Sequence, residues 1–184
     1  MRDLVVRAQR GDVDAFSELV AMRTERLFAT ARLILRHDER AADAVQDAWL
    51  QVWLDLRGLR DPDFFDTWMH RLLVRACYRA AKRHRGREIG EIRVAPAGEP
   101  STPDAQSVVA VRDQLDRAFR GLSTDQRAVI VLHHYLGLSL AESAAVLAIP
   151  LGTMQSRLSR ATAVMRAAIE ANDRPTALSH GVAR

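Results

Sequence analysis

The sequence predicts an all-α protein made of two small helical domains joined by a flexible linker. Apolar residues recur at helical spacing through most of the chain, and the β-branched alternation that is typical of strands is missing. Glycine and proline are few except in one stretch, residues 86–104. We therefore expect an N-terminal domain at 1–85, the linker at 86–104, a C-terminal domain at 105–171 and a disordered tail at 172–184.

The composition favours a polyanionic partner and excludes several kinds of site. Lysine and arginine number 27 against 23 aspartates and glutamates, which gives a formal net charge of +4. Cys77 is the only cysteine, which excludes an internal disulfide and a cysteine-rich metal site and fits a reducing cytosol. No apolar run has the length of a signal peptide or a membrane span, so we expect a soluble, cytoplasmic protein with no membrane contact of its own.

Three helices are predicted before the first loop. A short one covers residues 3–10 and ends at Gly11. Asp12 can cap a longer one, whose apolar residues keep helical spacing as far as Leu35. Asp38 can cap the third helix, whose core-facing residues recur at intervals of four, three and four: Val45, Trp49, Val52 and Leu56.

A second stripe lies beside this core face of the third predicted helix. It mixes acids, an amide and large apolar groups: Asp43, Gln46, Asp47, Leu50 and Trp53. Such a mixture is typical of a protein-docking surface. A solvated flank, on which Trp53 simply completes the core, explains the same pattern equally well.

A loop over residues 57–63 and then a basic helix over about 64–85 follow. Gly58, Asp61 and Pro62 interrupt the helical pattern and predict the loop. After Asp66 the helix has no carboxylate, and its cations are Arg71, Arg75, Arg79, Lys82, Arg83 and Arg85. They form either a solvated helix end that is favourable to the helix dipole or a track for a nucleic-acid backbone. Two aromatic residues among them either belong to the core or stack on unpaired bases: Trp68 and Tyr78.

Two capping boxes organise the C-terminal domain. After helical periodicity that Gly121 ends, Ser123 with Gln126 predicts a helix over about 125–135. Ser139 with Glu142 predicts a second, short helix, and Pro150 breaks the helical run that follows it. Another helix then begins near residue 151, so that two helices joined by a tight turn form a helix-turn-helix.

The last helix has two chemically different faces. Its core side is predicted to hold Leu151, Met154, Leu158, Ala161 and Met165. The opposite side carries small hydroxyls, an amide and arginines with no acid: Thr153, Gln155, Ser156, Arg157, Ser159 and Arg160. Small side chains permit close approach to DNA and arginine donates to guanine edges or phosphates, so this face is typical of a major-groove reading helix. An ordinary amphipathic helix with a solvated basic face is the alternative.

Two separate stretches resemble one family. GLSLAESAAVLAIPLGTMQSRLSRA resembles the C-terminal promoter-reading module of alternative sigma factors of the extracytoplasmic-function (ECF) group. ADAVQDAWLQVW followed by FFDTWMHRLL resembles the N-terminal domain of the same group. The resemblance therefore implies an alternative sigma factor that binds core RNA polymerase and directs it to specific promoters for transcription initiation.

The resemblance also implies roles for particular residues and partners. Contacts with the polymerase β′ clamp would come from Asp43, Gln46, Asp47, Leu50 and Trp53. The loop 57–63, with Arg57, Arg60 and Asp61, would capture a flipped base of the minus-ten element, and Arg71, Arg75 and Arg79 would follow the opened strand. The minus-thirty-five element would be read by Gln155, Ser156, Ser159 and Arg160, with Thr153 and Arg157 on its backbone. The polymerase β flap, promoter DNA and an anti-sigma factor are the further partners implied, and no cofactor is expected.

Several residues depart from the family pattern. Ala148 stands where glycine is usual, so a turn that needs a positive φ would carry strain of about 1 kcal/mol. Ser143 occupies a usually aliphatic core position. Gln155 replaces a usual lysine or arginine, and Arg75 and Arg79 stand where asparagine and aspartate are common. The promoter sequence of relatives therefore cannot be transferred to this chain.

Two other classes of function remain open from the sequence. A free-standing helix-turn-helix repressor or activator would bind duplex DNA unaided, and copurification with core polymerase would distinguish a sigma factor from it. An enzyme is disfavoured because the chain has no paired carboxylates, phosphate loop or nucleophile motif. His133 and His134 lack further ligands at metal spacing, and we interpret them as surface or backbone-facing groups.

Overall fold

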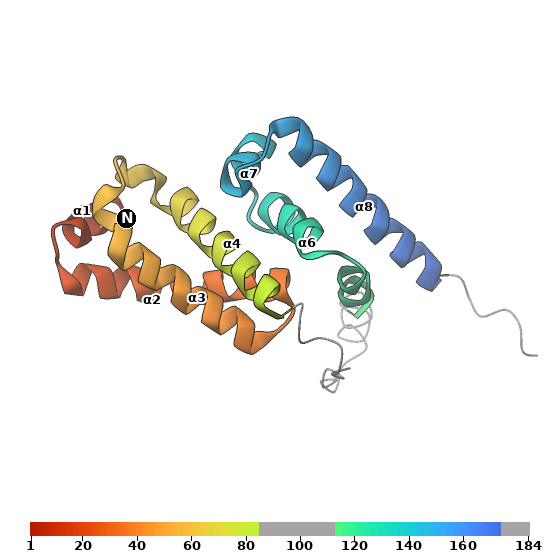
Figure 1. Cartoon of the computed structure of the whole chain (residues 1–184), viewed down its shortest axis with the longest axis horizontal. Helices are drawn as coiled ribbons and strands as arrows, with labels where there is room; N and C mark the ends of the chain where they lie inside the picture. Colours follow the sequence, from red (N-terminus) through yellow and green to blue (C-terminus); the bar gives the residue numbers. More distant parts are fainter. Residues whose placement is uncertain (85–112, 174–184) are drawn as a thin grey trace, which may run out of the picture.

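The computed structural model describes residues 1–84 and 113–173, and these residues are helical with no strand among them (Figure 1). This confirms the all-α prediction. The linker predicted at 86–104 and most of the predicted tail lie outside the described residues. No helix in the described part is both long and apolar enough to cross a membrane.

The N-terminal half consists of four α-helices and two short 3₁₀ turns. In chain order these are α1 (Arg2–Gln9), α2 (Val13–Leu35), α3 (Asp38–Asp55), η1 (Leu56–Gly58), η2 (Pro62–Phe64) and α4 (Phe65–His84). Asp12 caps α2 as predicted, because its carboxylate accepts from the Ala15 N–H at 2.9 Å. Gly11 has a φ of +96°, a left-handed conformation that suits glycine and lets the chain turn from α1 into α2.

The predicted cap of α3 was wrong. Asp38 is the first residue inside this helix, and His37 is its N-cap, with the ring nitrogen Nδ1 accepting from the Arg40 N–H at 3.4 Å. An acid in the first turn still interacts favourably with the positive end of the helix dipole. The prediction of an acid at the start of this helix was therefore right, but Asp38 is the first helical residue and not the N-cap.

The C-terminal half contains the predicted helix-turn-helix. Residues 113–120 are helical and are followed by α6 (Thr124–Ile130), η3 (Val131–Tyr135), α7 (Leu140–Leu147) and α8 (Leu151–Asp173). Both capping boxes are formed, with reciprocal hydrogen bonds at Ser123 and Gln126 and at Ser139 and Glu142. The helix predicted over 125–135 differs in its second half, because η3 is a π-helix that extends α6. α8 begins at Leu151 as predicted and continues to Asp173, into the first two residues of the predicted tail.

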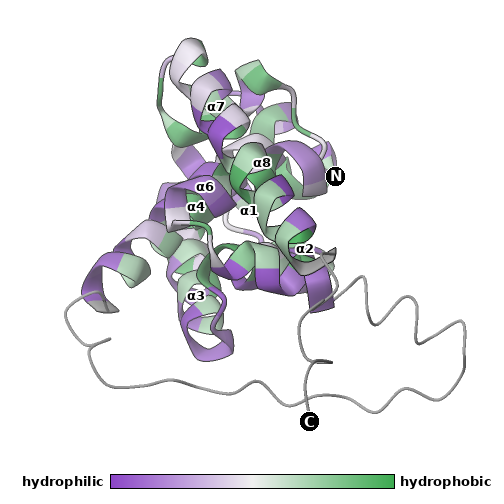
Figure 2. Ribbon diagram, turned by 90° about the vertical axis from the view of Figure 1, so that its right-hand side faces the viewer, coloured by the Kyte–Doolittle hydropathy of each residue, from purple (hydrophilic) through white to green (hydrophobic). Residues whose placement is uncertain are grey.

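The helices of the two halves share one apolar core. Hydropathy alternates along the individual helices in Figure 2, as expected for amphipathic segments that bury one side. The core of α2, α3 and α4 continues into the C-terminal half through Ala128, Val131, Leu132 and Val146. A second, smaller core within the C-terminal half includes Met154 and Ala161 of α8. In Figure 1, α6 lies between α4 and α8, and α4 also contacts α7.

One ion pair reinforces this contact between the halves. The Arg36 guanidinium, at the end of α2, lies 2.8 Å from the Asp116 carboxylate in the helical stretch 113–120. This hydrogen bond with Arg36 holds the pKa of the Asp116 carboxyl below its usual range. The pair is only partly exposed on the arginine side, so it is screened less than a free surface pair.

Two departures from the family pattern have structural consequences. Ala148, at the C-terminal cap of α7, has a φ of +53° and therefore adopts the left-handed conformation that usually requires glycine. Ser143 is fully buried, and its hydroxyl has no hydrogen-bond partner. Both residues lie on α7 or its cap, so the first helix of the helix-turn-helix contains two unfavourable positions.

Trp49→Ala should destabilise the protein strongly, whereas Trp53→Ala should not. Trp49 is 8% exposed, and its indole N–H donates to the Thr24 hydroxyl at 3.0 Å. Removing it leaves a large cavity and takes the indole donor from the Thr24 hydroxyl, which keeps its bond to the Val20 carbonyl, so we expect a loss of about 3 to 5 kcal/mol in the free energy of unfolding. Trp53 is 48% exposed, so Trp53→Ala should lower the free energy of unfolding by only about 1 kcal/mol. Urea unfolding followed by circular dichroism measures both, and equal losses would contradict the burial assigned here.

Ala148→Gly should raise the free energy of unfolding by about 1 kcal/mol, because glycine adopts the left-handed conformation without strain. The matched control is Ala145→Gly on the same helix. Ala145 is exposed and helical, so the same substitution there should lower the free energy of unfolding by about 1 kcal/mol. The opposite signs would appear as opposite shifts of the urea midpoint, and a destabilising Ala148→Gly would refute the strain at the cap.

Candidate functional site

The five predicted docking residues of α3 line one groove. The groove has a volume of about 530 Å³ and is lined by Asp43, Gln46, Asp47, Leu50 and Trp53, with Phe16, Trp49 and Arg83 completing its wall. We call these eight residues the α3 groove. Leu50 is 59% exposed although it is apolar, and the acids lie around it. Exposed apolar groups with a polar rim are typical of a protein-binding surface.

Aromatic packing positions the two tryptophans of the groove differently. Phe16 of α2 lies edge-on to both rings, with centroid distances of 5.8 Å to Trp49 and 4.8 Å to Trp53. Trp49 is buried behind Phe16, and Trp53 remains half exposed. The sequence predicted Phe16 as scaffold only, because its spacing indicates which side of α2 is buried and says nothing of what lies across from it.

The basic helix α4 obtains a carboxylate from α3. The Asp47 carboxylate lies 3.5 Å from the Arg83 guanidinium and 4.0 Å from that of Arg79. The sequence has no acid on α4 beyond Asp66, so this charge compensation was missed. All three side chains are at least a third exposed, and such pairs contribute only about 0 to 1 kcal/mol. An anion that binds Arg79 or Arg83 can therefore replace the Asp47 carboxylate at a small cost in free energy.

The predicted stripe of arginines on α4 is only partly free. Arg71, Arg75 and Arg79 are spaced by four residues and so lie along one side of the helix. Arg75 is exposed, whereas Arg71 is partly buried and its Nε has no hydrogen-bond partner. Arg75 and Arg79, which are both exposed, are therefore more accessible to an anion than Arg71.

The aromatic residues of α4 pack against the core. Trp68 lies 6.2 Å from the Phe65 ring, and Tyr78 is largely buried beside the C-terminal half. Burial, together with the nearby Asp125 carboxylate, raises the pKa of the Tyr78 phenol. These contacts favour the core interpretation of both residues over stacking on unpaired bases.

The loop predicted at 57–63 connects η1 to η2 and presents polar side chains. Arg57, Arg60 and Asp61 are all exposed, as their predicted contact with a DNA strand requires. Sequence reasoning missed Phe64, which is 62% exposed at the end of η2. An exposed aromatic ring beside such a loop is able to stack on an unpaired base. Its place at a predicted helix start, next to a second phenylalanine, was the available signal.

The predicted reading face of α8 is largely open to solvent. Gln155, Ser156, Ser159 and Arg160 are exposed, and Met154 and Ala161 on the opposite side are fully buried. The core prediction was wrong for Leu151, which is 46% exposed, because it stands at the first position of the helix, beyond the buried part.

The two arginines of α8 have different surroundings. Arg160 donates to the Ser156 carbonyl at 3.2 Å and to the Ser156 hydroxyl at 3.3 Å, which directs its guanidinium along the exposed side. Arg157 is less exposed and pairs with Asp125 of α6 at 3.7 Å. Arg160 therefore lies on the open side of α8, whereas Arg157 and the partly buried Thr153 lie closer to the protein body.

The remaining candidate groups have structural surroundings. His133 Nδ1 lies 2.8 Å from the Leu138 carbonyl oxygen, and His134 is exposed, so both match their prediction as backbone-facing or surface groups. Cys77 is buried, and burial raises the pKa of its thiol to about 12. Among residues 1–84 and 113–173, no cluster of histidine, cysteine or carboxylate side chains has a metal-binding arrangement.

Comparison with known proteins identifies the family. Residues 19–87 match the family described as Sigma-70 region 2, and residues 112–163 match Sigma-70, region 4. The chain is 30% identical to the ECF RNA polymerase sigma factor SigM of Mycobacterium tuberculosis, over 88% of this chain and 80% of that protein. It is also 30% identical to the RNA polymerase sigma factor CnrH of Cupriavidus metallidurans, over 93% and 95%.

Two solved structures have the same fold. CnrH, solved in complex with the cytosolic domain of CnrY, matches with a TM-score of 0.66 and 28% identity over 94% of this chain and 98% of that one. RpoE of Bartonella quintana, solved with the anti-sigma factor NepR, matches with a TM-score of 0.65 and 25% identity over 86% and 98%. Sequence and fold agree that this chain belongs to the ECF family of RNA polymerase sigma factors.

Proposed function

We propose that this chain is an alternative sigma factor that binds core RNA polymerase and directs it to specific promoters, with no chemistry of its own. Membership of the sigma-factor family supports this function. The observation that carries it at the level of residues is the α3 groove, because all five residues that the sequence predicted for polymerase docking line it. The same membership supports action in the cytoplasm, where bacterial polymerase transcribes.

The three surfaces are assigned one role each. The α3 groove docks on the polymerase β′ clamp, and the C-terminal domain lies near the β flap. The loop 57–63, with the arginine stripe of α4, captures the opened minus-ten strand. The exposed face of α8 reads the minus-thirty-five element, with Gln155, Ser156, Ser159 and Arg160 on bases and with Thr153 and Arg157 on the backbone.

An anti-sigma factor is the further partner that we propose. CnrH was solved with the cytosolic domain of CnrY, and RpoE with the anti-sigma factor NepR, and both have the fold of this chain. Exposed apolar side chains of α3, such as Leu50 and Leu54, would be available to a partner of this kind.

The closed packing of the two halves does not fit simultaneous contact with both promoter elements. Elements about 25 base pairs apart are separated by about 85 Å along B-DNA. A compact body of this size has a radius of gyration of about 15 Å and a diameter of about 40 Å. The contact of α4 with α6 and α7 must therefore open when polymerase binds.

The chain alone should bind promoter DNA weakly, and core polymerase should raise its affinity by about 100-fold or more. Polymerase holds the two halves on one DNA, so the second contact becomes intramolecular. The measurement is a titration of labelled promoter with the chain alone and with core enzyme at physiological salt. Thymines near the minus-ten element should become reactive to permanganate only in the presence of polymerase.

Promoters with one element scrambled are the controls for this titration, and each should lose most of the gain. Tight, sequence-specific binding by the chain alone, with no effect of polymerase and no strand opening, would instead support a repressor. The titration thus separates the two classes that the helix-turn-helix alone leaves open.

Replacing both Asp47 and Leu50 with lysine should abolish polymerase binding and leave the fold nearly unchanged. Both side chains line the α3 groove outside the buried core, and charge reversal there repels any partner that is complementary to the present surface. Because the ion pairs of Asp47 are exposed, their loss should lower the free energy of unfolding by no more than about 1 kcal/mol. Fluorescence anisotropy with core enzyme measures the affinity.

The matched control replaces Glu18 and Met22 of α2 with lysine. This pair is also one acid and one exposed apolar residue, and it lies outside the α3 groove. The control variant should bind polymerase like the unmodified chain. If the Asp47 and Leu50 variant still supported transcription, the α3 groove could not be the docking surface.

A further inference from the structure

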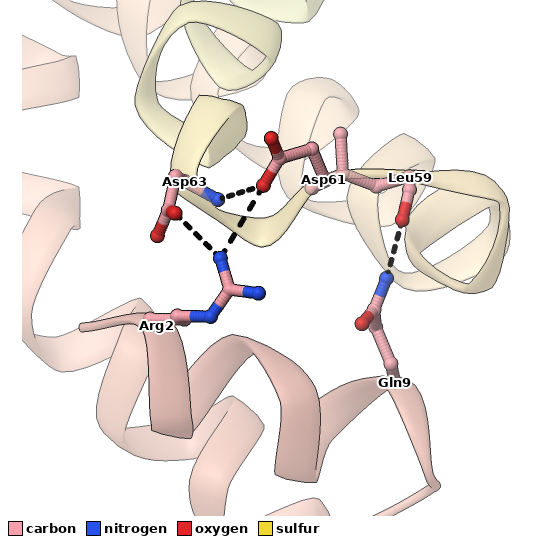
Figure 3. Close-up of polar contacts among 5 residues, drawn as sticks. All are labelled: Arg2, Gln9, Leu59, Asp61 and Asp63. Carbon is pink, nitrogen blue, oxygen red and sulfur yellow. Dashed lines mark hydrogen bonds and ion pairs between the residues drawn. The ribbon is translucent and has the colours of Figure 1, made fainter.

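Helix α1 contacts the loop between α3 and α4 at both ends of that loop (Figure 3). At its beginning, the Gln9 side-chain amide donates to the Leu56 carbonyl at 3.0 Å and to the Leu59 carbonyl at 2.7 Å. The two amide hydrogens of Gln9 thus serve two backbone oxygens that lie 47 and 50 residues further along the chain. Neither the sequence nor the family match assigns Gln9 a role.

The Gln9 contact reinforces a first turn of the loop that the backbone itself closes. The Leu59 N–H donates to the Leu56 carbonyl at 3.1 Å, and Leu56 is buried. Fixing both carbonyls from outside leaves Arg57 and Gly58 on a single exposed 3₁₀ turn. The Gln9 hydrogen bonds are part-buried. Without them the Leu56 carbonyl would keep only the Leu59 N–H as a donor, and the Leu59 carbonyl would lose the Gln9 donor.

A weaker contact holds the end of the loop. The Arg2 guanidinium pairs with the carboxylates of Asp61 and Asp63, all three being at least half exposed. Asp61 also accepts from the Asp63 N–H at 3.0 Å and so caps η2. Exposed pairs of this kind are screened by salt. The Gln9 amide is therefore the firmer of the two contacts.

We propose that Gln9 is a positioning residue for minus-ten recognition: its amide holds the loop in the conformation that receives the flipped base. This inference rests on the proposed role of loop 57–63 as the site of capture. A loop that is already ordered in the free protein loses no further conformational entropy when it captures the opened strand. Such preorganisation increases affinity for that strand. Gln9 acts through the Leu56 and Leu59 carbonyls and touches no DNA itself.

The test uses the full chain with core polymerase and the variants Gln9→Met and Gln9→Glu. Methionine keeps the unbranched stem and the helix preference but donates no hydrogen bond. Ionised glutamate keeps the shape and brings an acceptor against two acceptors. The matched control is Gln51→Ala, because the Gln51 amide donates to the Asp55 carboxylate of the same helix.

Three quantities are measured for each protein: affinity for core polymerase, affinity of the holoenzyme for a duplex that carries only the minus-thirty-five element, and affinity for a single-stranded minus-ten oligonucleotide. Both Gln9 variants should lose about 10-fold in the third quantity and change the first two by less than 2-fold, the scale expected for two hydrogen bonds. Fluorescence of 2-aminopurine at the captured position should rise more slowly in these variants. The Gln51 variant should match the unmodified chain throughout.

The melting temperature of every variant is measured first. If one Gln9 variant has a lowered melting temperature, the affinities of the other Gln9 variant are used for the test. Unchanged single-strand affinity and opening rate in the folded variants would overturn the proposal. An equal loss in all three affinities would also overturn it, because it would indicate a general structural role. If the unmodified holoenzyme does not prefer the minus-ten strand to a scrambled one, the proposed function of the loop fails as well, which distinguishes the two failures.

Discussion

The burial of α4 from two directions is the constraint on which the rest of the structure depends. Its residues pack against α2 and α3 on one side and against α6 and α7 on another. Leu72, Leu73 and Val74 are consequently all buried, although three consecutive residues span about 200° of a helix and cannot share one face. What remains for solvent is a narrow side, and this is where Arg75 and Arg79 lie. The shape of the core thus determines which cations of this helix an anion is able to reach.

Local rules predicted much of this fold from the sequence. The capping boxes at Ser123 and Ser139 formed as expected because they need only residues three positions apart. A left-handed conformation at Ala148 was considered only as a condition, from the glycine that is usual at this place in the family pattern, and the structure has it. Interactions between elements could not be predicted in this way. The pairing of Asp47 with Arg83 and the packing of Phe16 on Trp53 depend on how helices meet, which spacing within one helix does not encode.

The candidate site divides in the same manner. The groove residues of α3 and the exposed face of α8 follow from helical periodicity, and the sequence predicted both. The π-helix η3 and the contact of Gln9 with the loop depend on tertiary packing, which the sequence pattern did not predict. Arg157 shows the limit most clearly: it was predicted as a free phosphate ligand, and the structure pairs it with Asp125 of a neighbouring helix.

The cationic side chains with proposed roles on DNA are held less strongly than the loop between α3 and α4. Arg79 and Arg157 each pair with one carboxylate across a half-exposed contact, at distances of 4.0 Å and 3.7 Å. Such pairs contribute little, so phosphates are able to replace the carboxylates without a large penalty. The Gln9 amide, in contrast, is part-buried and bonds to backbone. The Gln9 hydrogen bonds therefore keep the shape of the loop fixed, while Arg79 and Arg157 are able to exchange their carboxylate partners for phosphates.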